Sequence, residues 1–125
     1  MKRHQRLRSS ADFARVRGSG RSLVQPLLVL TVLANELDHS RVGVTVSRRV
    51  GTAVVRNRIR RRLSEALRTR YADLPLGQDL VLVARPAAAG ASWAELNQAL
   101  DRALARATAF TPGTAAPAAA SDHVE

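Results

Sequence analysis

The segment at residues 53–70 constrains the fold of this chain more than any other part of the sequence. Its apolar residues recur every three or four positions, which is the period of a helix with one buried face. These residues are Val55, Ile59, Leu63, Ala66 and Leu67. The same segment contains R-N-R-I-R-R-R at residues 56–62, with five arginines in seven positions. Like charges repel by roughly a few tenths of a kcal/mol per i,i+4 pair, so we expect an external anion to offset this cost.

Short apolar runs on both sides of this helix predict strands. They cover residues 22–25, 27–33, 41–47 and 79–85. In the third run Val42, Val44 and Val46 alternate with small and polar residues, so one face is expected to pack on the core. The run at 27–33 is followed by the polar stretch N-E-L-D-H-S, which predicts a turn and a hairpin to residues 41–47.

A first, shorter helix is predicted near the start of the chain. Ser9 or Ser10 can cap it, because serine is a preferred residue at the position before a helix. Phe13 falls on its apolar face, and Gly18 and Gly20 are expected to end it.

A last helix follows the capping box formed by Ser92 and Glu95. Its apolar positions are Trp93, Leu96, Leu100, Ala103, Leu104 and Ala107. The order helix, strands, helix, strand, helix indicates an α+β fold, a sheet with helices packed on it. We expect one domain over residues 1–110 and a disordered tail over 111–125, where the sequence has no period.

The charge of the chain is concentrated in one half. The net charge is +10 over 125 residues, and residues 1–70 contain 17 basic and four acidic side chains, whereas residues 71–125 contain three and six. Such a one-sided field attracts a polyanion, and arginine suits phosphate well. There is no cysteine and no apolar run of the roughly 20 residues that a membrane span needs. We therefore expect a cytoplasmic protein with no membrane partner and no small-molecule substrate.

The arginine-rich helix is expected to continue a basic surface that begins before it. Arg48 and Arg49 stand between the third strand and the helix. A basic run that continues across strand end, loop and helix is better explained by phosphate contacts than by a solvated face. Asn57 is a poor helix former among the arginines, and it either bonds a sugar hydroxyl or base edge or braces an arginine.

No residues predict catalysis by the protein itself. His4, His39 and His123 lack the spacing of metal ligands, and Asp73 and Asp79 form no obvious metal pair, so each is expected at the surface. The residues leave two other classes open: a ribosomal or assembly protein that uses the helix as an RNA staple, and a DNA-binding regulator. The arginine helix follows a strand rather than a short helix and turn, which argues against the regulator.

One continuous stretch, R-V-G-V-T-V-S-R-R-V-G-T-A-V-V-R-N-R-I-R-R-R-L at residues 41–63, resembles the signature of the bacterial ribonuclease P protein components. The resemblance centres on Arg56, Asn57 and Arg58. The opening M-K-R-H-Q-R-L-R-S-S-A-D-F-A-R-V is also similar to that family's N-terminus, and the likeness covers roughly residues 2–108.

The resemblance implies an α/β sandwich of the ribosomal protein S5 domain 2-like type, with a left-handed crossover between parallel strands. It also implies a protein subunit that assists a catalytic RNA in removing the 5′ leader from precursor tRNA. The RNA performs the hydrolysis, with Mg²⁺ bound mainly by RNA phosphates and substrate. The implied partners are the catalytic RNA and precursor tRNA.

The resemblance also implies two sets of contact residues. Those facing the catalytic RNA are Arg48, Arg49, Arg56, Asn57, Arg58, Arg60 and Arg61. Those lining a leader cleft between the first helix and the open sheet face are Phe13, Arg17, Leu28, Leu30 and Thr45. Family members often have further aromatic rings around this cleft, but this chain has Arg17, Leu28 and Thr31 there. Phe13 is therefore the evident platform for base stacking, unless it is a core anchor of the first helix.

Overall fold

The computed structural model describes residues 2–109, with side chains up to residue 107. Its helices are α1 (Ser10–Ser19), α2 (Ala53–Arg70) and α3 (Trp93–Ala109), and its strands are β1 (Arg21–Val24), β2 (Leu28–Ala34), β3 (Arg41–Val46) and β4 (Gln78–Ala84). Short 3₁₀ turns lie at η1 (Arg3–Gln5), η2 (Arg48–Val50), η3 (Tyr71–Asp73) and η4 (Pro86–Gly90). The expected α+β order is confirmed. The tail predicted over residues 111–125 lies outside the described residues.

The four strands form one mixed sheet in the order β1-β2-β4-β3. Strands β1 and β2 form an antiparallel hairpin, β2 pairs antiparallel with β4, and β4 pairs parallel with β3. The predicted hairpin between residues 27–33 and 41–47 is wrong, because β4 lies between those strands. The physical reason is burial: Leu80, Val81 and Leu82 are all fully buried, so β4 needs cover on both faces and on both edges.

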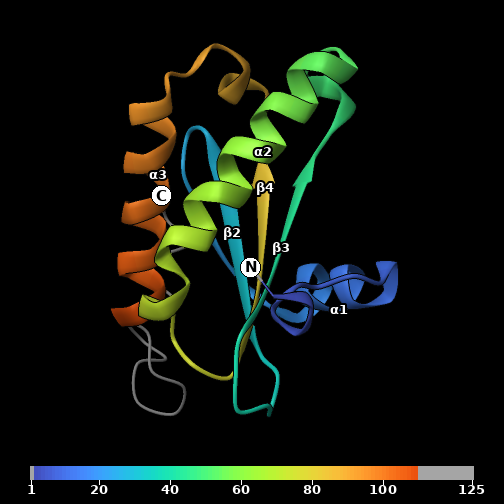
Figure 1. Ribbon diagram of the computed structural model, residues 1–125, viewed down its shortest axis with the longest axis vertical. Coiled ribbons are helices and arrows are strands. Elements are labelled where there is room, and N and C mark those ends of the chain that lie inside the picture. The colour runs from blue at the N-terminus through green and yellow to red at the C-terminus, as the bar shows by residue number, and fades with distance from the viewer. Residues whose placement is uncertain (1, 110–125) are drawn as a thin grey trace.

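Helix α2 connects the parallel strands β3 and β4. In Figure 1 both strands point upward, α2 crosses in front of the sheet, and β4 lies to the left of β3. This arrangement is a left-handed crossover, whereas about 98% of such connections are right-handed. The expected handedness is confirmed. It leaves β3 as an edge strand, with α2 packed over it.

The main core lies between the sheet and helices α2 and α3. The predicted stripe of α2 is buried there, with Ile59 and Leu67 at 0% exposure and Leu63 at 1%. Thr52 begins α2 by accepting a hydrogen bond from the Val55 N–H at 3.3 Å. Trp93 departs from the prediction for α3, since it is 43% exposed at the first residue of the helix.

Caps at the ends of the other two helices agree with the sequence. Ser92 and Glu95 exchange hydrogen bonds at 2.8 and 3.1 Å, so the capping box at the start of α3 is confirmed. Ser9 caps α1 by accepting from the Asp12 N–H at 3.0 Å. Gly18 lies inside α1, and the helix ends at Gly20, where a Cβ would stand 2.5 Å from the Val16 carbonyl oxygen.

A smaller cluster covers the opposite face of the sheet. Leu7, Val16 and Val81 are buried in it, and Phe13 packs against it. Helix α1 therefore lies on the face that α2 and α3 leave open. Among the described residues, no helix has the length and apolar content required to cross a bilayer.

Asp79 is the second residue of β4 and is fully buried, so its expected place at the surface is wrong. Its Oδ1 accepts hydrogen bonds from Arg41 Nε at 2.9 Å and Asn35 Nδ2 at 2.8 Å. Its Oδ2 accepts from Arg41 Nη2 at 2.7 Å and from Arg15 Nη2. Burial acts to raise the pKa of Asp79, but these hydrogen bonds outweigh burial and hold it below the ordinary value of 3.8. The carboxylate thus joins α1, β3 and the end of β2.

Replacing Asp79 with asparagine removes this charge and leaves Arg15 and Arg41 without their common partner. Because loss of one member of a buried ion pair is strongly destabilising, we expect Asp79→Asn to lower the free energy of unfolding at neutral pH by about 3 kcal/mol. The lowered pKa of Asp79 means that its contribution is present above pH 3.8 and is lost as the pH falls through the folded-state pKa. Urea unfolding from neutral pH down to pH 2 should show wild type and variant converging.

Asp101→Asn is the matched control, because Asp101 pairs with Arg70 but its side chain is 63% exposed. Its effect should stay below about 1 kcal/mol. Equal effects of the two substitutions, or a difference for Asp79→Asn that does not change with pH, would contradict this assignment.

Candidate nucleic-acid interface

The basic turn η2 joins β3 directly to the N-terminus of α2. Arg48 and Arg49 are both exposed on this turn. Gly51 follows with φ of 156°, a conformation that side chains rarely adopt, and a Cβ there would stand 3.2 Å from Val55 Cγ1. The turn therefore places two exposed arginines directly before the N-terminus of a helix, which is itself attractive to anions.

The arginines of α2 divide between exposed and half-buried positions. Arg61 and Asn57 are exposed, whereas Arg56, Arg58 and Arg60 are half-buried. Asn57 Oδ1 accepts a hydrogen bond from Arg60 Nη1 at 2.7 Å. Of the two interpretations of Asn57, the structure shows the brace: its amide oxygen holds the Arg60 guanidinium in place.

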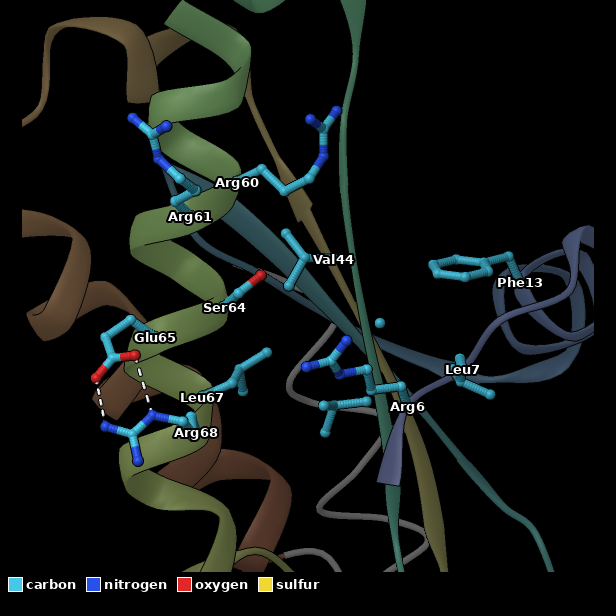
Figure 2. A pocket seen from close by; sticks show the side chains of 12 residues that line it. Arg6, Leu7, Phe13, Val44, Arg60, Arg61, Ser64, Glu65, Leu67 and Arg68 are labelled. Carbon is cyan, nitrogen blue, oxygen red and sulfur yellow. Dashed lines mark hydrogen bonds and ion pairs between the residues drawn. The ribbon is translucent and has the colours of Figure 1, made fainter. Parts of the chain in front are cut away.

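A groove of about 660 Å³ runs along the outer edge of β3, and we call it the β3 groove. One wall comes from α2, with Arg60, Arg61, Ser64, Glu65, Leu67 and Arg68, and the other comes from the N-terminal segment and α1, with Arg6, Leu7 and Phe13. Its floor is Val42, Gly43 and Val44 on β3. Figure 2 shows Arg60 and Arg61 on one side of the strand and Phe13 on the other.

The edge strand itself is only partly covered. The Leu7 N–H donates to the Val42 carbonyl oxygen at 2.8 Å, and Arg6 forms an isolated bridge with Val42. Beyond this bridge, the outer edge of β3 has no strand partner in residues 2–109. The groove therefore offers backbone polar groups between basic and apolar side chains.

The charge of the β3 groove is positive. Glu65 is the acidic residue in its lining, and Arg68 donates to both Glu65 oxygens, with Arg68 Nε at 3.0 Å from Oε1. This hydrogen bonding lowers the pKa of Glu65, so the carboxylate stays charged and paired. Arg61 has no carboxylate partner among the described side chains, and Arg60 donates its hydrogen bond there to the neutral Asn57 amide. The field on the α2 wall thus comes from these two arginines.

Phe13 packs edge-on against the strand at a glycine. A Cβ on Gly43 would stand 2.4 Å from Phe13 Cζ, so the absence of a side chain at residue 43 makes room for the ring. Phe13 is half-buried, packs on the small cluster and also lines the groove. It is both an anchor of α1 and a ring that a ligand in the groove can reach.

The other residues expected in a leader cleft do not line this groove. Leu28 and Leu30 are fully buried in the main core, so their expected place in the cleft is wrong. The reason is strand parity: even-numbered residues of β2 face α2 and α3, as the pairing of Leu30 with Leu82 shows. Arg17 is exposed on α1 and Thr45 is half-buried on β3, and neither belongs to the lining.

Sequence reasoning missed Arg6, Leu7 and Ser64 as groove residues. The signal for the first two was the similarity of the N-terminal segment to the family. Nothing local marks Ser64, which reaches the groove only because α2 packs over β3. Arg56 and Arg58 lie on α2 outside the groove lining.

Comparison with known proteins places the chain in one family. The family described as Ribonuclease P matches residues 1–108. A ribonuclease P protein component from Herpetosiphon aurantiacus is 42% identical over 107 residues, covering 86% of this chain and 87% of that protein. One from Gluconacetobacter diazotrophicus is 45% identical over 107 residues, covering 84% and 92%.

Solved structures of the same family share the fold. The RNase P protein of Staphylococcus aureus superimposes with a TM-score of 0.78 at 30% identity, covering 86% of this chain and 98% of that chain. The RNase P protein of Thermotoga maritima gives a TM-score of 0.74 at 30% identity, covering 81% and 96%. With the fold, the arginine helix and the sequence likeness in agreement, the chain belongs to the ribonuclease P protein component family.

Proposed function

We propose that this chain binds the catalytic RNA of ribonuclease P and the 5′ leader of precursor tRNA, and that it thereby assists removal of the leader. The observation that carries this proposal is the β3 groove, in which Arg60 and Arg61 on α2 face Phe13 across the edge of β3. Arginines neutralise phosphates, and an aromatic ring stacks on a base, so this pairing suits a single strand of RNA.

In this proposal the η2–α2 surface and the β3 groove bind different RNAs. The exposed Arg48 and Arg49 of η2, together with the half-buried Arg56 and Arg58 in the first turns of α2, form a basic surface near a helix N-terminus, which suits the folded backbone of the catalytic RNA. The β3 groove is concave and contains Phe13, which suits an unpaired leader. Charge and one ring, rather than several stacked rings, would then hold the leader.

Chemistry is assigned in this proposal to the RNA, with Mg²⁺ held by RNA phosphates and substrate. Two acids near the interface are engaged by arginines: Asp79 by Arg15 and Arg41, and Glu65 by Arg68. Within residues 2–109, three or more His, Cys, Asp or Glu side chains do not gather as a metal site. The protein's own contribution is to neutralise phosphates and to position the substrate strand.

The function is tested by cleavage of precursor tRNA in a reconstituted mixture of catalytic RNA and protein at low Mg²⁺. Addition of the protein should raise cleavage, because bound arginines replace part of the Mg²⁺ that screens RNA phosphates. A structural RNA staple, such as a ribosomal or assembly protein, would bind RNA and leave cleavage unchanged. No gain in cleavage would therefore reject the proposal in favour of that alternative.

Arginine substitutions should change RNA binding in a way that depends on salt. We expect Arg56→Ala and Arg61→Ala each to weaken binding of the catalytic RNA and to flatten the plot of log affinity against log salt by about one unit per lost phosphate contact. Filter binding across a salt series measures the slope. Arg102→Ala is the control, since Arg102 lies on α3 and bonds Gln25 at 3.3 Å. Slopes equal to wild type for both α2 variants would exclude direct phosphate contact.

The contact between Phe13 and Gly43 gives a separate test of leader binding. In Gly43→Ala the new methyl group would stand 2.4 Å from Phe13 Cζ and must displace the ring. Since stacking on an aromatic ring is worth about 1–3 kcal/mol per base, we expect Gly43→Ala and Phe13→Ala to weaken holoenzyme binding of precursor tRNA with a leader by about tenfold. Affinity for mature tRNA, which has no leader, should stay unchanged.

Gly18→Ala is the matched control for this experiment. Gly18 lies on α1, the same helix as Phe13, but a Cβ added there would meet nothing within 4 Å, so the substitution should leave leader binding intact. Wild-type affinity for the leader-bearing substrate in both Gly43→Ala and Phe13→Ala would show that the ring does not contact the leader.

A further inference from the structure

A second basic hollow lies at the N-terminal segment, outside the α2 surface. It has a volume of about 640 Å³ and lies between the N-terminal segment and the connection from β2 to β3. Its lining includes Arg3, His4, Arg6, Arg8, Asp12 and His39. We call it the N-terminal hollow. None of its basic residues belongs to the set that the family signature marks.

The segment that carries these arginines is held in place by hydrogen bonds. The Leu7 N–H donates to the Val42 carbonyl oxygen at 2.8 Å, which ties the segment to the edge of β3. His39 Nε2 lies 3.1 Å from the His4 carbonyl oxygen, which ties it to the connection between β2 and β3. The rings of His4 and His39 also meet edge to face at 5.1 Å. The backbone that carries the arginines is therefore ordered before a ligand binds, which reduces the conformational entropy lost on binding.

The hollow carries an excess of positive charge. Asp12 is the acid in its lining, and its carboxylate lies 3.5 Å from Arg15 Nη2 and 3.8 Å from Arg41 Nη1. Those two arginines also bind Asp79, so the charge of Asp12 is balanced within the cluster of Asp12, Arg15, Arg41 and Asp79. Arg3 and Arg8 are exposed, and neither has a carboxylate partner in the described part of the chain. Basic side chains in such excess over acidic ones attract an anionic ligand from outside the protein.

Arg6 lines both the N-terminal hollow and the β3 groove. The two hollows therefore adjoin at Arg6, and together they extend from Arg61 on α2, across the edge of β3, to Arg3. An RNA strand that leaves the groove at Arg6 meets the hollow next, because the two share this arginine. This continuity favours the phosphodiester backbone of RNA as the ligand over an isolated small anion.

We propose that the N-terminal hollow is a second phosphate-binding site, in which Arg3 and Arg8 contact the backbone of an RNA strand separately from the α2 surface. The inference rests on the proposed function, since it takes the chain to be an RNA-binding subunit. The phosphates belong either to the catalytic RNA or to precursor tRNA, and the two sources are distinguished by experiment.

The test uses the full chain with the double substitution Arg3→Ala and Arg8→Ala. One arm measures binding of the protein to the catalytic RNA alone, and the other measures binding of precursor tRNA to the assembled holoenzyme. We expect about a threefold loss of affinity at low salt and a plot of log affinity against log salt that is flatter by about two units, as two lost phosphate contacts require. A change in the first arm assigns the phosphates to the catalytic RNA, and a change in the second arm alone assigns them to the substrate.

Two controls make the outcome unambiguous. The double substitution Arg3→Lys and Arg8→Lys keeps both charges and should keep the wild-type salt slope. Arg61→Ala, measured in parallel, reports on the proposed function. If Arg61→Ala weakens binding and the double alanine variant matches wild type in both arms, the second site is rejected and the proposed function stands. If none of these variants changes binding in either arm, both are rejected.

Discussion

The buried carboxylate of Asp79 on β4 joins helix α1 to strand β3 and to the end of strand β2. It accepts hydrogen bonds from Arg15 on α1, Arg41 on β3 and Asn35 after β2. A charge in such a place is stable only when it is fully paired, and here the paired state also lowers its pKa. Together with the burial of Val16 in the small cluster, this pairing fixes α1 on the sheet, and both Phe13 and the wall of the β3 groove depend on the position of α1.

The shape of the interface follows from the central place of β4. Because Val81 and Leu82 are buried on opposite faces, β4 takes a position between β2 and β3, and β3 becomes an edge strand. The left-handed crossover then returns the chain through α2, which packs over β3 (Figure 1). An exposed strand edge usually invites pairing with another strand. Here arginines and an aromatic ring flank that edge, so the exposed edge suits an RNA strand.

The arginines of α2 illustrate how one element serves both folding and binding. The stripe of Ile59, Leu63 and Leu67 supplies the packing that stabilises the helix. The other face can therefore carry several arginines despite the repulsion between their charges. Asn57 orients Arg60 through a hydrogen bond of 2.7 Å, which fixes a guanidinium before any ligand binds. Glu65 pairs with Arg68 further along the helix, so the positive field of the groove is concentrated at Arg60 and Arg61.

The sequence by itself determined the elements whose signals are local. Helix α2 occupies residues 53–70 as predicted, and the predicted caps at Ser9 and Ser92 are present, because a helix and its caps depend on neighbours three or four positions apart. Only the tertiary structure decided the order of the strands, since pairing joins residues far apart in the chain. The resemblance implies a place for Leu28 and Leu30 in the cleft, and the largely apolar run of β2 does not reveal which of its faces is buried, so the sequence could not correct that placement. Asp79 looked like a surface acid for the same reason: its three partners come from elements that only the folded chain brings together.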